Sequence, residues 1–246
     1  MCGRYHLTRD PLETLRASGA GALPGERDPF APRYNIAPSE PPPPPDSKRA
    51  TPPRLTRVPI ARRRDGEGVV EEAVWPLVPV WAKGEVSRYS TANARSETMR
   101  ESRTFGHAWK GGQRCLIPAT GFYEWQDVGE RTKQPWDLEP LNEPFFTFGG
   151  LWEVSYASDD TAVLSCTIVT VPANPLMTEI HNAGKNRHRM PLILAPEDRA
   201  AWLEGSPADA DALVASFPAD EMAARAIGTA INNPSFDDPR VLEPLA

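Results

Sequence analysis

Proline is the residue type that most limits what this chain can fold into. It accounts for 28 of the 246 residues, and five consecutive prolines stand at 41–45. Proline fixes its φ angle and lacks an amide donor, so the stretch from Ser39 to Pro53 can form neither a helix nor a central strand. We predict a solvated, polyproline-like loop at 39–53 that serves as a spacer, with a ligand for an SH3-type domain as the alternative.

Short segments of β-type composition dominate the rest of the chain. Four of them are rich in β-branched and aromatic residues, with turn signals between them: 115–125, 144–154, 162–171 and 190–195. Weaker helical patterning predicts helices over 10–17, 97–109, 172–180, 196–204 and 207–216. Short strands mixed with scattered helices indicate an α+β fold. We expect a single domain over residues 1–246, built on a curled, barrel-like, mainly antiparallel β-sheet with peripheral helices.

The composition is that of a globular protein, with 40% hydrophobic and 24% charged residues. No apolar run approaches the ~20 residues that a membrane span needs, and the N-terminus lacks the apolar core of a signal peptide. We therefore expect a cytoplasmic protein with reduced cysteines and no membrane partner. No CxxC motif or phosphate-binding glycine loop is present, so we expect neither a metal nor a cofactor. Cys115 and Cys166 lie in apolar stretches and are interpreted as small core residues.

The net charge of −6 argues mildly against nucleic-acid binding, because affinity for a phosphate backbone comes largely from Lys and Arg. The charge is uneven, however. Basic residues gather at 62–64, 110–114 and 185–189. These clusters are compatible with a local basic groove on an acidic protein, and composition does not decide the matter.

Cys2 directly follows the initiator methionine in a chain with only three cysteines. A residue at this position is usually part of a frayed end without a role. Here the sequence continues as Gly-Arg-Tyr-His-Leu, which is not the composition of a flexible tail. Once Met1 is removed, Cys2 carries a thiol and a free α-amine on adjacent carbons, a combination that no internal cysteine offers.

Other groups of residues could carry chemistry beside Cys2. Asn93 and Arg95 lie in the segment 90–98, which also fits the capped start of a helix. Glu124 lies in the aromatic segment 121–125, where alternation puts it on the same strand face as Phe122. Glu124 is either an edge residue that faces water or a buried acid of the kind used in general acid–base catalysis. The segment 179–191 holds two histidines and several basic residues, and it also fits a solvated basic loop.

Seven motifs, taken together and in this order, resemble the SOS response-associated peptidase (SRAP) family, whose members act on abasic sites in DNA. They are MCGRY at the start, RYNIAPS (33–39), WPLVPVWA (75–82), NARSET (93–98), GFYEW (121–125), IHN with RMPLIL (180–194) and INNPSFDDPRVLEPL (231–245). The resemblance extends over nearly the whole chain. Two features depart from the family pattern, namely the proline loop and a longer stretch between His181 and Arg189.

The resemblance implies covalent capture of abasic sites in single-stranded DNA. The amine of Cys2 adds to the ring-opened aldehyde of the sugar, and the thiol then closes a thiazolidine. Glu124 would donate and accept protons, His181 would stabilise or protonate the sugar oxygen, and Asn93 would orient Cys2 and the lesion. The resemblance further implies a role in the DNA damage response, association with the nucleoid, and lyase and autoproteolytic activities.

The DNA would be held by a second set of residues. The resemblance implies that Arg4, Arg95 and Arg189 hold phosphates, a role that suits arginine because it binds two oxygens at once. Trp81 would stack on a base next to the lesion, or else it is a core tryptophan. We expect the protein to act as a monomer.

Two alternative functions remain open on the sequence, and so does the choice of histidine. An N-terminal cysteine also serves as the nucleophile of amidohydrolases and peptidases, in which the amine acts as base. A non-covalent nucleic-acid-binding module is the third class. His181 is preferred to His188, because it follows the apolar Ile180, whereas His188 ends a polar, glycine-containing run. Residues 183–188 would then loop out, and Arg189 would return to the site.

Overall fold

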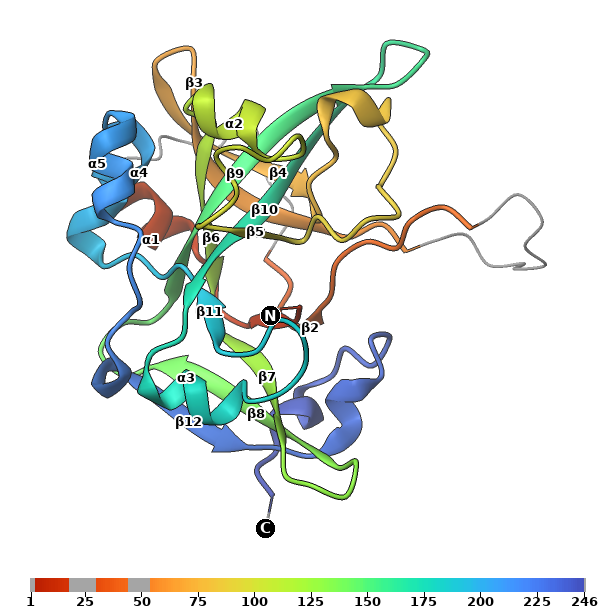
Figure 1. Cartoon of the computed structure of the whole chain (residues 1–246), viewed down its shortest axis with the longest axis vertical. Coiled ribbons are helices and arrows are strands. Elements are labelled where there is room, and N and C mark those ends of the chain that lie inside the picture. The colour runs from red at the N-terminus through yellow and green to blue at the C-terminus, as the bar shows by residue number, and fades with distance from the viewer. Residues whose placement is uncertain (1–2, 18–29, 44–53, 246) are drawn as a thin grey trace.

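Five strands close into a barrel in the computed structural model, which describes residues 3–17, 30–43 and 54–245 (Figure 1). They are β3 (Arg57–Arg64), β4 (Glu67–Val74), β6 (Arg114–Ala119), β9 (Phe146–Tyr156) and β10 (Ala162–Pro172). The ring closes because β9 pairs with β6 and also with β10. The pairing of β4 with β10 is parallel and the other pairings within the ring are antiparallel. The expected curled, mainly antiparallel barrel of an α+β protein is confirmed.

Two short strands extend this sheet, and both pair with β10. They are β5 (Asn93–Arg95), which runs parallel to β10, and β11 (Arg189–Pro191), which runs antiparallel to it. The C-terminal half of β10 therefore lies between β5 and β11. Because of this arrangement, three segments that are distant in the sequence meet at one end of the barrel.

A second, antiparallel sheet lies beside the barrel in the lower part of Figure 1. Its order is β12-β8-β7-β1-β2. The strands are β1 (Tyr5–Leu7), β2 (Arg33–Ile36), β7 (Gly121–Asp127), β8 (Lys133–Pro140) and β12 (Met222–Ala226). The N-terminal strand β1 is thus paired on both sides, by β2 and β7.

The helices are short and lie around the two sheets. The α-helices are α1 (Leu12–Ala17), α2 (Gly106–Lys110), α3 (Pro175–Ile180), α4 (Arg199–Glu204) and α5 (Pro207–Ala212). The 3-10 turns are η1 (Val80–Ala82), η2 (Pro196–Asp198), η3 (Ala219–Glu221), η4 (Thr229–Asn232) and η5 (Pro239–Leu242). Within the described part of the chain, no helix has the length and apolar character needed to cross a membrane.

The hairpin β3–β4 was not among the predicted strands. Its two-residue turn consists of Asp65 and Gly66, with φ angles of 54° and 82°. Positive φ at both turn positions matches the right-handed twist of paired strands, and an Asp-Gly pair is a common solution. The Asp-Gly pair could therefore have predicted this hairpin. The three arginines at 62–64 hid it, because they interrupt the apolar pattern expected of a strand.

Two predicted elements are wrong in extent. The segment 115–125 is not one strand, because the chain leaves β6 at Ala119 and enters β7 at Gly121 in the other sheet. The backbone amide of Thr120, between them, donates to the carbonyl of His6 on β1. The helix predicted over 97–109 is reduced to α2 at its C-terminal end, preceded by turns. Long-range partners hold those turns: Arg100 binds Asp211.

Apolar side chains of both sheets form the main core, and Cys115 and Cys166 are fully buried in it, as expected. Burial raises the pKa of both thiols well above the ordinary range. Of the proline-rich loop, residues 39–43 are described and form neither helix nor strand, whereas 44–53 lie outside the described residues. The amide of Glu40 donates to the carbonyl of Arg54, so the two described ends of this loop lie side by side.

Candidate active site

Strand β7 determines the position of Glu124. Alternation along the strand directs Phe122 into the main core and Tyr123 into a smaller cluster with Ile227, Ile231 and Val241. Glu124, on the same face as Phe122, is only 3% exposed. The edge-residue interpretation of Glu124 is therefore wrong, and the carboxyl group is buried.

His181 directly follows α3. This helix begins as its sequence indicates, with the Asn174 side chain accepting from the amide of Met177 and with Pro175 in the first turn. Its other end lies on β7, because Gln126 Nε2 donates to the carbonyl of Glu179 at 3.2 Å. His181 is 6% exposed.

The His181 imidazole interacts electrostatically with Glu124. Burial lowers the pKa of His181, because the charged ring is poorly solvated, and the negative charge of Glu124 partly opposes this effect. The net shift is downward from the ordinary value of 6.5. The two side chains, which are 57 positions apart in the sequence, thus share one buried site, with the imidazole neutral at physiological pH.

The loop after His181 closes on itself. The amide of His188 donates to the carbonyl of His181 at 2.8 Å, and the His181 ring atom Nδ1 lies 3.0 Å from the carbonyl oxygen of Arg189. Residues between these contacts project outward, and His188 itself is exposed with a φ of 56°. The structure therefore places His181, and not His188, beside Glu124, while the catalytic role of either ring stays a prediction.

Arg189 returns to the site but is already engaged. Its Nη1 and Nη2 bind the two carboxylate oxygens of Glu97 at 2.7 and 2.8 Å. Its Nε donates to Thr170 Oγ1 at 3.2 Å. The guanidinium is mostly buried, so a phosphate would have to share it with Glu97. Glu97 was not singled out in the sequence, although it lies in the NARSET motif.

Asn93 and Arg95 lie on strand β5, so the capped helix start predicted for this segment is wrong. Parallel pairing with β10 sets Asn93 opposite Ile168 and Arg95 opposite Thr170. Asn93 is half-buried, and Arg95 is exposed and contacts Asn186 of the loop after His181.

The N-terminal segment runs antiparallel to β7 toward Glu124. Tyr5 pairs with Phe122, and the amide of Tyr123 donates to the carbonyl of Arg4 at 3.0 Å. By this register Gly3, the residue before Arg4, continues along β7 toward Glu124. Cys2 lies outside the described residues.

Arg4 is held by a residue that the sequence left without a role. Its Nη1 donates to Asn35 Oδ1 at 3.0 Å and to the carbonyl of Ile231 at 2.8 Å. The Asn35 amide in turn donates to the carbonyls of Asn233 and Phe236. Burial lowers the pKa of Arg4, and the charge of Arg54 adds to the effect. The RYNIAPS and INNPSFDDPRV motifs therefore meet beneath the N-terminal segment.

Trp81 is not a core residue. It lies on η1, is 40% exposed, and its ring lies 5.4 Å from the guanidinium carbon of Arg103. Together with Lys83, Arg88 and Tyr89 it lines an open groove of about 490 Å³. Tyr89, which is 79% exposed, was missed in the sequence because it stands in a polar segment without a recognisable pattern.

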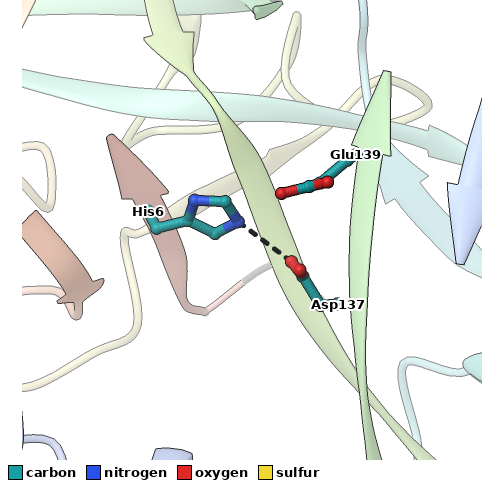
Figure 2. A group of neighbouring side chains, drawn as sticks. All are labelled: His6, Asp137 and Glu139. Atoms are coloured by element: carbon teal, nitrogen blue, oxygen red, sulfur yellow. Dashed lines mark hydrogen bonds and ion pairs between the residues drawn. The ribbon is translucent and has the colours of Figure 1, made fainter. Parts of the chain in front are cut away.

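One group of side chains among the described residues has the composition of a metal site (Figure 2). It consists of His6, Asp137 and Glu139. His6 Nε2 lies 2.9 Å from Asp137 Oδ1, and Arg225 Nη2 lies 2.7 Å from Asp137 Oδ2. Arg225 already supplies the positive charge that a cation would bring, so this group links β1, β8 and β12 as an ion-pair network.

Comparisons with known proteins find similar chains. The chain matches the family model described as SOS response associated peptidase (SRAP) over residues 1–234. The abasic site processing protein YoqW of Bacillus subtilis (strain 168) is 31% identical, and the alignment covers 99% of each chain. The abasic site processing protein HMCES of Pongo abelii is 30% identical, over 100% of this chain and 76% of that protein.

Solved structures share the fold. A protein from Bacteroides thetaiotaomicron superposes with a TM-score of 0.76 at 22% identity, with all of both chains covered. A protein from Bordetella bronchiseptica gives a TM-score of 0.72 at 25% identity, over 92% of this chain and 100% of that one.

Proposed function

The chain belongs to the SOS response-associated peptidase (SRAP) family, and from this premise we propose that it processes abasic sites in single-stranded DNA by capturing them covalently through Cys2. One observation carries the proposal: Glu124 and His181 are buried together at the strand along which the N-terminal segment runs. Gly3, the first residue described, is joined to Cys2 by a single peptide bond, and consecutive Cα atoms are about 3.8 Å apart. In this proposal the reacting group of Cys2 acts close to the acid and the imidazole.

The proposed reaction is a condensation. The ring-opened abasic sugar presents an aldehyde, to which the Cys2 amine adds through its nitrogen lone pair. Loss of one water gives an imine, and the Cys2 sulfur then bonds to the same carbon while its proton passes to nitrogen. The product is a five-membered thiazolidine, with one water lost overall and no change of oxidation state. An α-amine of ordinary pKa, about 7.7–8.0, has a useful neutral fraction at physiological pH.

Glu124 and His181 divide the proton transfers in this scheme. Glu124, as a carboxylate, takes the proton of the anomeric hydroxyl as the sugar opens and passes it to the ring oxygen. It then takes a proton from the amine that has added and gives it to the hydroxyl that leaves as water. His181 stays neutral because burial lowers its pKa. Its Nδ1–H donates to the carbonyl of Arg189, so Nε2 carries the lone pair and stabilises the sugar by accepting from the hydroxyl that forms at the ring oxygen. Positioned proton transfer of this kind is usually worth about 10²–10⁴ in rate.

The remaining assigned residues would hold the DNA. Asn93, half-buried on β5, would orient Cys2 and the lesion through its amide. Arg95 and Arg4 would contact phosphates, and Arg189 would do so in exchange with Glu97. The exposed ring of Trp81 would stack on a neighbouring base, an interaction that tolerates any sequence.

Intact-mass analysis after incubation with an abasic single-stranded oligonucleotide tests the proposal. We expect an adduct equal to the protein that begins at Cys2 plus the oligonucleotide less one water, formed in EDTA and stable to denaturation. Cys2→Ala should form no adduct, and a protein that retains Met1 should also form none. An adduct on the Met1-retaining form would overturn the aminothiol mechanism.

The same experiment separates the other two functions. An amidohydrolase would cleave amide substrates in a Cys2-dependent manner without capturing DNA. A non-covalent module would bind the oligonucleotide equally well with and without Cys2. For the proposed encounter with DNA, affinity should fall with salt at roughly 0.7 ion per phosphate contact on a single strand.

A further inference from the structure

Gln126 joins three elements around the candidate active site. It lies on β7 two residues after Glu124, so alternation puts both side chains on the same face of the strand. Its Oε1 accepts from Trp136 Nε1 on β8 at 3.0 Å, and its Nε2 donates to the carbonyl of Glu179 on α3 at 3.2 Å. This half-buried side chain therefore connects both strands of the β7–β8 hairpin with α3.

Trp136 fixes which way the Gln126 amide faces. An indole N–H only donates and a backbone carbonyl only accepts, so a single orientation of the amide satisfies both partners. Trp136 also lies directly opposite Glu124 in the pairing of β7 with β8. Side chains at opposite positions of an antiparallel pair are neighbours, with Cβ atoms about 4.5–5.5 Å apart. The group that orients Gln126 therefore flanks the buried carboxyl group of Glu124.

The contact with Glu179 lies at the end of α3 that leads to His181. The last carbonyl groups of a helix have no partner within the helix, and Gln126 provides a donor for one of them. His181 follows two residues later. On its other side, Asn182 is bound to Asp127, the next residue of β7. Two consecutive residues of β7 thus hold the chain on both sides of His181.

We propose that Gln126 is a positioning residue for the capture of abasic sites. Its hydrogen bond to α3 keeps the His181 ring beside Glu124, and its hydrogen bond to Trp136 keeps the amide turned toward α3. A misplacement of about 1 Å at a reacting group costs about 10²-fold in rate, so a bond outside the reacting pair sets the speed of the reaction. The inference rests on the proposed function, because it assumes that Glu124 and His181 act in that reaction.

Two matched variants, Gln126→Met and Gln134→Met, test the proposal. Methionine keeps the length of glutamine and removes its hydrogen bonds. Gln134 lies opposite Gln126 in the same hairpin and is also half-buried. It donates to two carbonyls as well, those of Pro135 and Ile227, and neither belongs to α3. The control therefore loses the same kind of side chain without releasing the end of α3.

Capture rates at increasing concentrations of an abasic single-stranded oligonucleotide give the first readout. Gln126→Met should lower the rate at saturating DNA by roughly 10- to 100-fold and leave the half-saturating concentration unchanged. Trp136→Phe, which keeps a ring and removes the indole N–H, should lower the rate in the same way. Gln134→Met should react like the wild type. Equal rates in the two methionine variants would overturn the proposal.

A double-variant comparison separates positioning from a merely structural role. His181→Ala has no ring left to position, so adding Gln126→Met to it should slow capture by less than about twofold. A structural role would instead give the same loss in the presence and absence of the His181 ring, and that result would overturn the proposal.

An NMR titration of the His181 ring tests the positioning without DNA. Burial lowers the pKa of His181 in the wild type. Release of the α3 end admits solvent to the ring, so its pKa should rise toward the ordinary value of 6.5 in Gln126→Met and stay unchanged in Gln134→Met. The same pKa in all three proteins would overturn the positioning role, even if the wild type captures DNA. A wild type that captures no DNA but shows the expected rise would overturn the proposed function and leave the placement of His181 by Gln126 standing.

Discussion

Asn182 and Asp127 exchange two hydrogen bonds. The amide of Asp127 donates to Asn182 Oδ1 at 2.8 Å, and Asn182 Nδ2 donates to the carbonyl of Asp127 at 3.0 Å. This reciprocal pair joins the segment after α3 to the end of β7, although the two residues are 55 positions apart in the sequence. Because His181 directly precedes Asn182, the pair ties the residue next to His181 to the strand that carries Glu124.

The first prediction concerns the two histidines and states that His181, and not His188, takes part in the reaction. His181→Ala should slow covalent capture of abasic DNA by roughly 10²–10⁴, the usual value of a positioned proton-transfer group. His188→Ala should retain nearly the full rate, because His188 is exposed in the loop that projects outward. Time courses on denaturing gels measure both. Loss of activity in the His188 variant alone would show that the wrong ring was chosen.

The second prediction concerns Glu124. Glu124→Gln keeps the size of the buried side chain and removes the transferable proton, so crosslinking should slow by about 10²–10⁴ while DNA affinity changes little. Stopped-time crosslinking gives the rate, and anisotropy with an undamaged oligonucleotide of the same sequence gives the affinity. An unchanged rate would remove Glu124 from the catalytic assignment.

The third prediction concerns the pair between Arg189 and Glu97. Glu97→Gln weakens two charge-assisted hydrogen bonds of a buried guanidinium, which should lower the free energy of unfolding by about 1–3 kcal/mol. If Arg189 also binds a phosphate, the same variant should bind single-stranded DNA more tightly, since a competing carboxylate is gone. Urea denaturation and DNA titration test the two parts separately. Weaker DNA binding would show that Glu97 positions Arg189 and does not compete with the phosphate.

The fourth prediction is a pH dependence of stability. Burial lowers the pKa of His181 in the folded protein below the ordinary value of 6.5, so the unfolded chain binds this proton more readily. The stability that the neutral ring contributes is complete above pH 6.5 and is lost as the pH falls through the lowered folded-state pKa. The stability of the wild type relative to His181→Gln should therefore decrease from about pH 8 to about pH 5. A difference that stays constant over this range would contradict the burial effect.

The fifth prediction tests the packing around His6. A Cβ at Gly121 would lie 2.4 Å from His6 Nε2 and 2.6 Å from the carbonyl oxygen of Leu138. Gly121→Ala should therefore destabilise the protein by about 1–3 kcal/mol, as overpacked sites do. Gly228→Ala is the matched control, because a Cβ there meets nothing within 4 Å and its φ is −68°. Equal stability of the two variants would show that β1 can move away from β7.

Local patterns in the sequence were sufficient for much of the fold. The β-branched and aromatic runs predicted the regions of β9, β10 and β11, and the helical pattern over 172–180 predicted α3, which begins three residues later than expected, at Pro175. Alternation along 121–125 correctly placed Phe122 and Glu124 on one face. These features depend on neighbouring residues, whose spacing is visible in the chain itself.

Other features depended on contacts that no local pattern contains. The segment 115–125 reads as one strand, yet it divides between two sheets because Thr120 binds His6. The predicted helix at 97–109 gave way to turns because Arg100 pairs with Asp211, which is 111 positions away.

The candidate site shows the same division. The sequence by itself determined which residue types are present: a cysteine directly after the initiator methionine, an acid among aromatics, and histidines before an apolar strand. Only the tertiary structure decided that Glu124 is buried, that His181 and not His188 lies beside it, and that Arg189 is bound to Glu97. The physical reason is that burial and ion pairing depend on which strands become neighbours, and strand pairing is a property of the whole fold.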